Sequence, residues 1–195
     1  MRTKSASSTV QYPNEHQNLI NDCKNGDQKA QFQIYKLYYK AMYNTSLRIV
    51  NDTMEAEDIM QESFLSAFEK IGSYSGTVSF GAWLKTIVQN RSIDALRKNK
   101  KMLFENIESC QGVTENTFES LTQIEEPDPR MIKVMEAIKR LPDLYRNIVS
   151  LYLFEGYDHE EIGEILSIPS STSRSQFSRA RQKIMVEFES LKLSS

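Results

Sequence analysis

The chain has 195 residues, of which 39% are hydrophobic and 26% are charged, and its formal net charge at pH 7 is -2. This length fits one larger or two small domains, and the hydrophobic content is enough for modest cores. No apolar run approaches the length of a membrane span or a signal peptide, and two cysteines and two histidines form no zinc-binding pattern. We therefore expect a cytoplasmic protein with reduced cysteines and with neither a metal nor a cofactor.

Apolar residues repeat at three- and four-residue spacing through most of the chain, which predicts an all-α fold. Residues 1–13 are rich in Ser and Thr and are expected to form a flexible tail. A Gly- and Ser-rich stretch at 72–79 predicts a loop. In this first half of the chain, helices are predicted at 15–24, 27–50, 53–71 and 80–101.

The predicted helix at 53–71 has an acidic side. Asp52 and Glu55 have the spacing of a capping box at its start. Its apolar stripe consists of Met60, Phe64, Ala67, Phe68 and Ile71, and the opposite face carries Glu57, Asp58, Gln61 and Glu62. Such a face can bind a basic protein surface. From charge alone, the preferred interpretation is a solvated face whose acidic first turn favours the helix dipole.

The predicted helix at 80–101 combines aromatic residues with basic ones. Tyr74, Phe80 and Trp83 lie at or before its amino end, and Asn90, Arg91, Arg97 and Lys98 follow. Aromatic faces next to cations are what single-stranded bases need, since the rings stack on bases and the cations neutralise phosphates. The alternative, that Phe80 and Trp83 belong to the hydrophobic core, remains equally open.

Residues 102–130 lose the helical periodicity and gain acidic residues, which predicts a flexible, self-repelling linker. After it, helices are predicted at 131–140, 142–154, 158–166 and 172–191. The sequence therefore predicts two small helical domains, at 14–101 and 131–195, joined by a flexible acidic linker.

The last two predicted helices have the pattern of a helix-turn-helix. Asp158 and Thr172 are placed to cap them, and Pro169 breaks the pattern between them. No acidic residue occurs between Pro169 and Val186, where Arg174, Arg179, Arg181 and Lys183 alternate with Ser and Gln. These side chains bind phosphates and base edges in DNA. An ordinary amphipathic helix with a solvated basic face is the alternative.

Three segments in this order carry a family resemblance: residues 52–64, residues 80–98 and the helix-turn-helix. Together they resemble a sigma-70 family RNA polymerase sigma factor of the extracytoplasmic-function (ECF) group. The resemblance covers about residues 32–101 and 135–185. It implies an initiation factor that binds core RNA polymerase and promoter DNA, both as duplex and as a melted single strand. It also implies an anti-sigma factor as a partner.

The resemblance assigns roles to particular residues of this chain. Core polymerase would be bound by Asp58, Gln61, Glu62 and Phe64. The minus-10 element would be bound by Tyr74, Phe80, Trp83, Asn90, Arg91, Arg97 and Lys98. The minus-35 element would be bound by Thr172, Arg174, Ser175, Gln176, Arg179 and Arg181.

The chain departs from the family pattern in and near the turn of the helix-turn-helix. The family usually has Ala at Gly163, Gly at Ser167 and Ser171, and an aliphatic residue at Ser173. Gly inside a helix costs about 1 kcal/mol relative to Ala, and Ser173 in an apolar position costs more unless it is hydrogen-bonded. We therefore expect these residues to loosen the second domain.

Two other functional classes are alternatives to a sigma factor. A helix-turn-helix regulator that binds duplex DNA without polymerase is the first alternative, but it has no need of the acidic face at 52–64. An enzyme is the second, and the chain has no phosphate-binding glycine loop, no metal-ligand set and no nucleophile–base pattern. We expect no catalytic residues and no small-molecule substrate.

Overall fold

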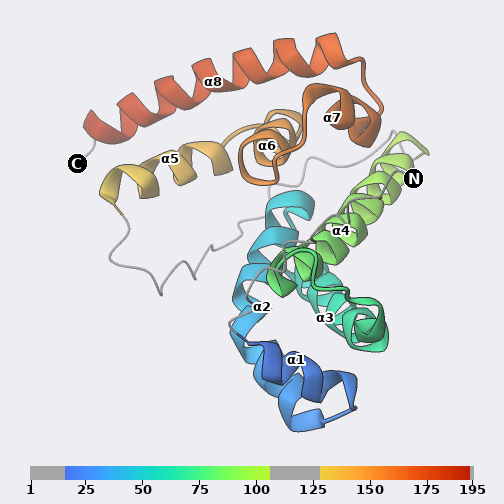
Figure 1. Cartoon of the computed structure of the whole chain (residues 1–195). Helices are drawn as coiled ribbons and strands as arrows, with labels where there is room; N and C mark the ends of the chain where they lie inside the picture. Colours follow the sequence, from blue (N-terminus) through green and yellow to red (C-terminus); the bar gives the residue numbers. More distant parts are fainter. Residues whose placement is uncertain (1–15, 106–127, 194–195) are drawn as a thin grey trace, which may run out of the picture. The chain divides into compact units, whose positions relative to one another are not determined.

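The computed structural model describes residues 16–105 and 128–193, and every regular element in these two ranges is a helix (Figure 1). In chain order they are α1 (Gln17–Lys24), α2 (Gln28–Val50), α3 (Thr53–Glu69), the 3-10 turn η1 (Ile71–Ser73), α4 (Phe80–Glu105), α5 (Pro129–Lys139), α6 (Asp143–Val149), the π-helical turn η2 (Ser150–Phe154), α7 (His159–Leu166) and α8 (Ser170–Leu193). The predicted all-α fold is confirmed. None of the helices in the described ranges is both long and apolar enough to cross a membrane.

The helix predicted at 80–101 is longer in the structure. α4 ends at Glu105 instead of at residue 101, and α5 begins at Pro129. Met, Leu, Phe and Glu at positions 102–105 permit a helix, so the loss of periodicity there did not end it. The predicted tail at 1–13 and the rest of the predicted linker lie outside the described residues.

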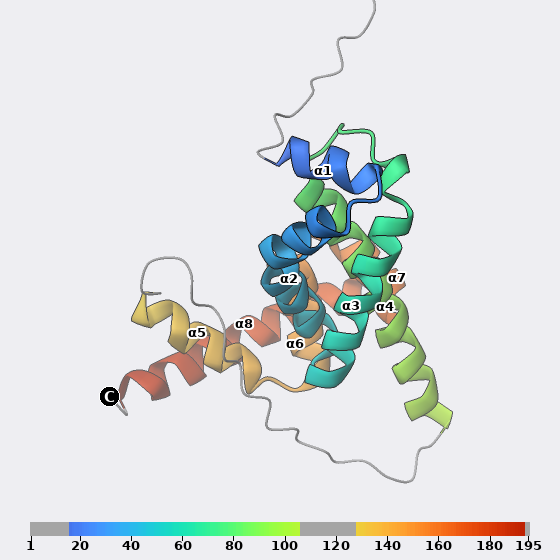
Figure 2. The same cartoon turned by 90° about the horizontal axis from the view of Figure 1, so that it is seen from below.

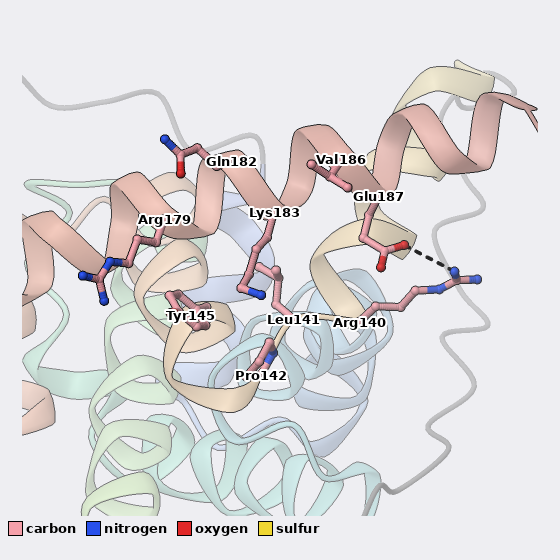
Figure 3. A pocket seen from close by; sticks show the side chains of 9 residues that line it. All are labelled: Arg140, Leu141, Pro142, Tyr145, Arg179, Gln182, Lys183, Val186 and Glu187. Atoms are coloured by element: carbon pink, nitrogen blue, oxygen red, sulfur yellow. Dashed lines mark ion pairs between the residues drawn. The ribbon is translucent and has the colours of Figure 1, made fainter.

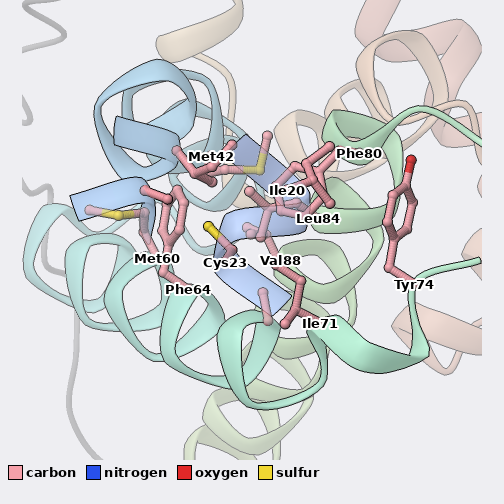
Figure 4. Close-up of a cluster of buried hydrophobic side chains, with 13 residues drawn as sticks. Ile20, Cys23, Met42, Met60, Phe64, Ile71, Tyr74, Phe80, Leu84 and Val88 are labelled. Atoms are coloured by element: carbon pink, nitrogen blue, oxygen red, sulfur yellow. The ribbon is translucent and has the colours of Figure 1, made fainter. Parts of the chain in front are cut away.

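Contacts divide the chain into two compact units, residues 1–92 and 93–195, with the boundary inside α4. The first unit has one hydrophobic core built by α1, α2, α3, η1 and the start of α4 (Figure 4). Its members include Ile20 from α1, Ile34 from α2, Phe64 from α3 and Leu84 from α4. Burying a side chain of this size contributes about 1.5–3 kcal/mol. The predicted domain limits at 101/102 and 130/131 stay a prediction.

α2 and α3 begin with side-chain caps that the sequence supplies. Asp27 accepts hydrogen bonds from the backbone N–H groups of Lys29 and Ala30, and Asp52 accepts one from that of Glu55 at 2.8 Å. The second of these is one half of the predicted capping box. The apolar stripe predicted for α3 faces the core, as Met60, Phe64, Ala67 and Ile71 are all members of it and Phe68 packs against it.

In the second unit α8 packs against α5, α6 and α7, and Figures 1 and 2 both show α8 running beside α5 and α6. Ile138, Leu141, Val149 and Ala180 form a buried cluster between these helices. The helix predicted at 142–154 is not uniform, because α6 changes after Val149 into the wider π-helical turn η2. This turn directs Tyr152 toward the amino end of α7, where the Tyr152 and His159 rings stack.

In and near the turn between α7 and α8 lie two positions at which the chain departs from the family pattern, Ser167 and Gly163. Ser167 ends α7 in the left-handed conformation, with φ 53°. The backbone N–H of Ile168 then donates to the carbonyl of Gly163 at 2.9 Å. A Cβ atom at Gly163 would lie 2.8 Å from the carbonyl oxygen of Ile168. Gly163 therefore permits a close approach of the turn and does not merely weaken α7.

One predicted cap in this region is wrong. α8 begins at Ser170, so Thr172 lies inside its first turn and does not cap it. The carbonyl of Pro169 accepts the backbone N–H of Ser173 at 3.0 Å, which is the first helical bond of α8. The helix begins directly after Pro169 because the proline, which has no N–H to satisfy, ends the turn.

Candidate nucleic-acid interface

α3 exposes three of the four residues that were predicted to bind core polymerase. Asp58, Gln61 and Glu62 are exposed. Phe64 is only 3% exposed and packs edge-on against Tyr35, with 4.9 Å between ring centroids. Its ring is a member of the core and holds α3 against α2, and a contact of Phe64 with polymerase stays a prediction.

Two apolar side chains next to this acidic face were missed by the sequence reasoning. Met54 is 78% exposed and Leu65 is 65% exposed. Together with Asp58 and Gln61 they follow the i, i+4, i+7, i+11 spacing of one helix face. The signal was present in the sequence, since both residues are apolar and lie off the core stripe of α3.

Glu62 and Arg91 were predicted to serve two different partners, yet they contact each other. Nη1 of Arg91 on α4 donates to Oε2 of Glu62 on α3 at 2.7 Å. The side chains are 39% and 64% exposed, so water screens the pair and it contributes little to stability. Its effect is to place the acidic face of α3 directly beside the basic part of α4.

The loop between η1 and α4 is held by aromatic residues that are buried. Tyr74 is 4% exposed and Phe80 is 1% exposed, while Trp83 is half-buried. The three ring centroids lie 5.3–5.5 Å apart. Tyr74 and Phe80 pack on each other and on the core, so the core alternative holds for Phe80, and their contact with bases stays a prediction. Stacking of a base on Trp83 stays a prediction.

Two hydrogen bonds fix this loop to the rest of the first unit. The hydroxyl of Tyr74 donates to the carbonyl of Val78 at 2.6 Å, which closes the loop on itself. Nζ of Lys24 on α1 donates to the carbonyl of Tyr74 at 3.0 Å and also lies 5.7 Å from the centroid of its ring. Lys24 was not among the predicted residues, and it ties α1 to the loop.

α4 presents the polar side chains that were predicted to bind the minus-10 element. Asn90, Arg97 and Lys98 are exposed and Arg91 is half-buried. The seven-residue step from Asn90 to Arg97 places both on one side of the helix. Among the described residues Arg97 makes a long ion pair with Asp94, at 3.8 Å, which leaves its guanidinium able to reach a phosphate.

α7 begins with the cap that the sequence predicts. The Asp158 side chain accepts the backbone N–H groups of Glu160 and Glu161, and the Glu161 carboxylate accepts the N–H of Asp158 at 2.8 Å. These reciprocal bonds form a complete capping box. They fix the amino end of α7, which begins with His159.

The amino-terminal half of α8 exposes most of the residues that were predicted to bind the minus-35 element. Arg174, Ser175, Arg179 and Arg181 are exposed, while Thr172 and Gln176 are half-buried. Arg174 lies 3.8 Å from the Glu160 carboxylate, and both side chains are more than half exposed. Oε1 of Gln176 is buried and has no hydrogen-bond partner in the described part of the chain. Reading a base through this oxygen would therefore require the side chain to turn outward.

Ser173 occupies the apolar position at which a hydroxyl was expected to be costly. It is 0% exposed, and its Oγ lies 2.9 Å from Nδ1 of His159. The hydroxyl is therefore hydrogen-bonded, which removes most of the desolvation cost. Burial, and then the nearby Arg174, lower the pKa of His159 below its ordinary value, against an opposing effect of Asp158.

A groove lies between α8 and the junction of α5 with α6 (Figure 3). Its volume is about 440 Å³. An ion pair between Arg140 and Glu187 at 3.5 Å crosses it, and Nζ of Lys183 lies 5.9 Å from the Tyr145 ring centroid. Val186 on its rim is 69% exposed. Residues far apart in the sequence line the groove, so the periodicity of single helices did not predict it.

The described residues contain no group of three His, Cys, Asp or Glu side chains arranged to hold a metal ion. The described helices expose separate charged faces, an acidic one on α3 and basic ones on α4 and α8.

Comparison with known proteins places both halves of the chain in one family. Residues 34–102 match the family model for Sigma-70 region 2, and residues 131–184 match that for Sigma-70, region 4. The chain is 30% identical over 180 residues to the ECF RNA polymerase sigma factor SigW of Bacillus subtilis (strain 168), covering 88% of this chain and 96% of that protein. It is 28% identical to the RNA polymerase sigma-H factor of Pseudomonas aeruginosa, covering 87% and 92%.

Among solved structures, the sigma factor RpoE in complex with the anti-sigma factor NepR from Bartonella quintana aligns with a TM-score of 0.49 and 20% identity. The alignment covers 80% of this chain and 95% of that chain. The family assignment rests on the two family models and on the sequence relatives. The acidic and the α4 faces fall within the region 2 match, and the helix-turn-helix falls within the region 4 match. The chain therefore belongs to the sigma-70 family of RNA polymerase sigma factors, in its ECF group.

Proposed function

We propose that this sigma factor binds core RNA polymerase through the exposed face of α3, reads the minus-35 element with α8 and helps to melt the minus-10 element with α4. One observation carries the proposal: a single chain exposes an acidic helix face in region 2 and a basic recognition helix in region 4. The acidic face repels DNA and suits a basic protein surface, whereas the basic face suits phosphates and base edges.

The face of α3 supports polymerase binding because it combines charge with apolar contact. Asp58 and Gln61 lie between the exposed apolar side chains of Met54 and Leu65. Apolar anchors surrounded by polar groups are typical of protein interfaces. A regulator that binds duplex DNA without polymerase has no use for such a face.

The minus-10 role is supported by α4 and by the loop that precedes it. Melting a base pair and unstacking the base cost a few kcal/mol, which stacking on an aromatic ring and phosphate contacts must offset. Trp83 is half-buried, and Asn90 and Arg97 are exposed further along α4. We propose that Trp83, Asn90 and Arg97, together with residues 74–79 of the loop, hold the separated strand.

The proposal makes the protein a non-enzymatic initiation factor of the cytoplasm, where its polymerase acts. It also gives the protein a second class of protein partner, an anti-sigma factor that competes with polymerase or DNA. The groove of Figure 3, with the exposed Val186 on its rim, is available for such a partner.

Promoter-dependent transcription with purified core polymerase tests the function directly. The wild-type chain and core enzyme would be used to select promoter DNA from a randomised pool, and the selected templates would be transcribed in run-off reactions. We expect specific transcripts that need both the chain and the core enzyme. Absence of a specific transcript from every selected template would contradict the proposal.

The polymerase-binding face has its own test. Leu65→Ala removes an exposed side chain, so the thermal stability should stay unchanged while co-elution with core polymerase on gel filtration weakens. Leu37→Ala on α2 removes another half-exposed leucine and serves as a matched control. Equal co-elution of the Leu65 and Leu37 variants would argue that α3 does not bind polymerase through this face.

A further inference from the structure

The two helices of the helix-turn-helix are joined by a partly buried hydrogen bond. His159 is the first residue of α7, and its Nδ1 lies 2.9 Å from Oγ of Ser173 on α8. Ser173 is 0% exposed, and Ile162, Ile165 and Ala180 are buried in the same two helices. A hydrogen bond in such surroundings is directional, so it restricts how far α8 can rotate against α7.

The imidazole of His159 is held in place by two aromatic rings, one from η2 and one from α8. Tyr152 from the π-helical turn stacks on it, with 4.7 Å between centroids and an interplanar angle of 15°. Phe177 from α8 meets it edge-on at 5.6 Å, and Tyr152 and Phe177 contact each other at 4.6 Å. Three segments of the unit therefore fix the direction in which Nδ1 points.

Ser173 and Phe177 lie one helical turn apart, so their contacts with His159 act on the same face of α8. The adjacent face carries Arg174, Ser175 and Arg179, all exposed. A rotation of α8 about its axis would swing these side chains sideways in a DNA groove. Base-edge contacts depend on direction, whereas attraction to phosphates depends mainly on charge and distance.

We propose that His159 and Ser173 form a latch that fixes the rotation of α8 on α7 and thereby sets which minus-35 bases the chain accepts. Both are positioning residues, since they act through Arg174 and its neighbours. The inference rests on the proposed function of α8 as the minus-35 reader and goes beyond it. It also gives a reason for Ser173, which departs from the aliphatic residue usual in the family.

The test is a double-mutant cycle in the full chain bound to core polymerase. Ser173→Ala removes the hydroxyl, His159→Phe keeps a ring between Tyr152 and Phe177 but removes Nδ1, and a third variant combines both. The probes are the duplex with the minus-35 sequence selected by the wild type, the same duplex with one base pair changed, and a scrambled duplex.

We expect each single variant to lower discrimination between the selected and the changed duplex by about threefold to tenfold, the value of one hydrogen bond. The double variant should lose no more than the worse single variant, because both changes remove the same bond. Affinity for the scrambled duplex should stay unchanged. Ser190→Ala, an exposed serine near the other end of α8, is the matched control.

The outcomes separate this inference from the proposed function. Lack of any selected minus-35 sequence and of promoter-dependent transcription in the wild type would defeat the proposed function itself. A wild type that discriminates, with both single variants discriminating equally well, would overturn the latch alone.

A merely structural role is also distinguishable. It would lower specific and scrambled-duplex binding together, in proportion to the folded fraction measured by thermal melting, and that result overturns the latch. If Ser173→Ala does not fold, the His159→Phe variant alone tests the latch. In that variant the Ser173 hydroxyl can donate to the carbonyl of Pro169 one turn earlier, so it keeps a hydrogen-bond partner.

Discussion

Two residues of the turn between α7 and α8 illustrate how single positions shape the DNA-reading unit. Ser167 takes a left-handed conformation that favours glycine, and Gly163 permits a contact that a side chain would block. His159 adds a partly buried hydrogen bond to the same unit. The left-handed backbone of Ser167, the close approach at Gly163 and the hydrogen bond of His159 all help to set the position of α8 against α7.

Ser167→Gly should stabilise the second unit. The left-handed conformation costs a residue with a Cβ atom about 1–2 kcal/mol, and glycine avoids this cost. Glycine also makes the unfolded chain more flexible, which offsets part of the gain in stability. We expect a net gain of about 0.5–1 kcal/mol in the free energy of unfolding, measured by urea denaturation. Asn51→Gly is the matched control, because Asn51 has φ 56° but asparagine tolerates this region better. A loss of stability in the Ser167 variant would contradict the prediction.

The stability of the second unit should depend on pH through His159. The pKa of His159 is lowered in the folded chain, chiefly by burial and then by Arg174. The unfolded chain therefore binds a proton more readily, so the stabilisation is complete above the ordinary histidine pKa of about 6.5 and is lost as pH falls below it.

Melting curves from about pH 8 to pH 5 would show this loss in the wild type, and His159→Phe should reduce the slope. Carboxylates that titrate in both proteins cancel in the difference between the two curves. Identical slopes would mean that His159 does not contribute.

At the level of elements, the loop before α4 is built as a rigid support and not as an open aromatic surface. Tyr74 and Phe80 are buried, and Lys24 holds the carbonyl of Tyr74 from α1. The helix that carries Asn90 and Arg97 therefore begins from a fixed point. We expect the proposed opening of promoter DNA by α4 to depend on that support.

Tyr74→Phe should weaken promoter opening without weakening duplex binding. The change keeps the buried ring but removes the hydroxyl that donates to the carbonyl of Val78 at 2.6 Å. We expect open-complex formation, followed by permanganate reactivity of unpaired thymines, to fall about threefold to tenfold. Binding to a minus-35 duplex should not change. Tyr39→Phe, in a half-buried ring of the same unit, is the control, and equal promoter opening in both variants would refute the support role.

At the level of the whole molecule, charge is segregated along the chain although its formal net charge is only -2. α3 exposes acidic groups, and α4 and the amino-terminal half of α8 expose basic ones. Net charge therefore says little about DNA binding here, and the two basic surfaces can be tested separately.

Arg97→Ala and Arg179→Ala should each lower the salt dependence of promoter binding, and each should act on a different promoter element. Removing one phosphate contact reduces the slope of log affinity against log salt by about 0.7 for single strands and about 0.9 for duplex. We expect Arg97→Ala to act on probes with an unpaired minus-10 region and Arg179→Ala on minus-35 duplexes. Titrations at several salt concentrations, with polymerase present, would check this. A slope unchanged by Arg97→Ala would argue against a phosphate contact there.

Much of the fold could be predicted because helix formation is largely local. The 3.6-residue repeat gave the helices, the cap at Asp158 gave the start of α7, and ordered motifs gave the family. Errors occurred where a local signal was ambiguous. Thr172 can cap a helix, but Pro169 started α8 earlier. Phe64 fitted both the core stripe and the interface, and only packing against Tyr35 showed that it is buried.

The sequence by itself determined that the chain is helical, that it carries a helix-turn-helix and that it belongs to the sigma-70 family. Only the tertiary structure decided which aromatic residues are buried, that Glu62 pairs with Arg91, and that Ser173 finds His159. The physical reason is that periodicity defines the faces of a helix from its own residues. What covers a face, or bonds to a buried hydroxyl, comes from residues far away in the chain, and only folding brings these together.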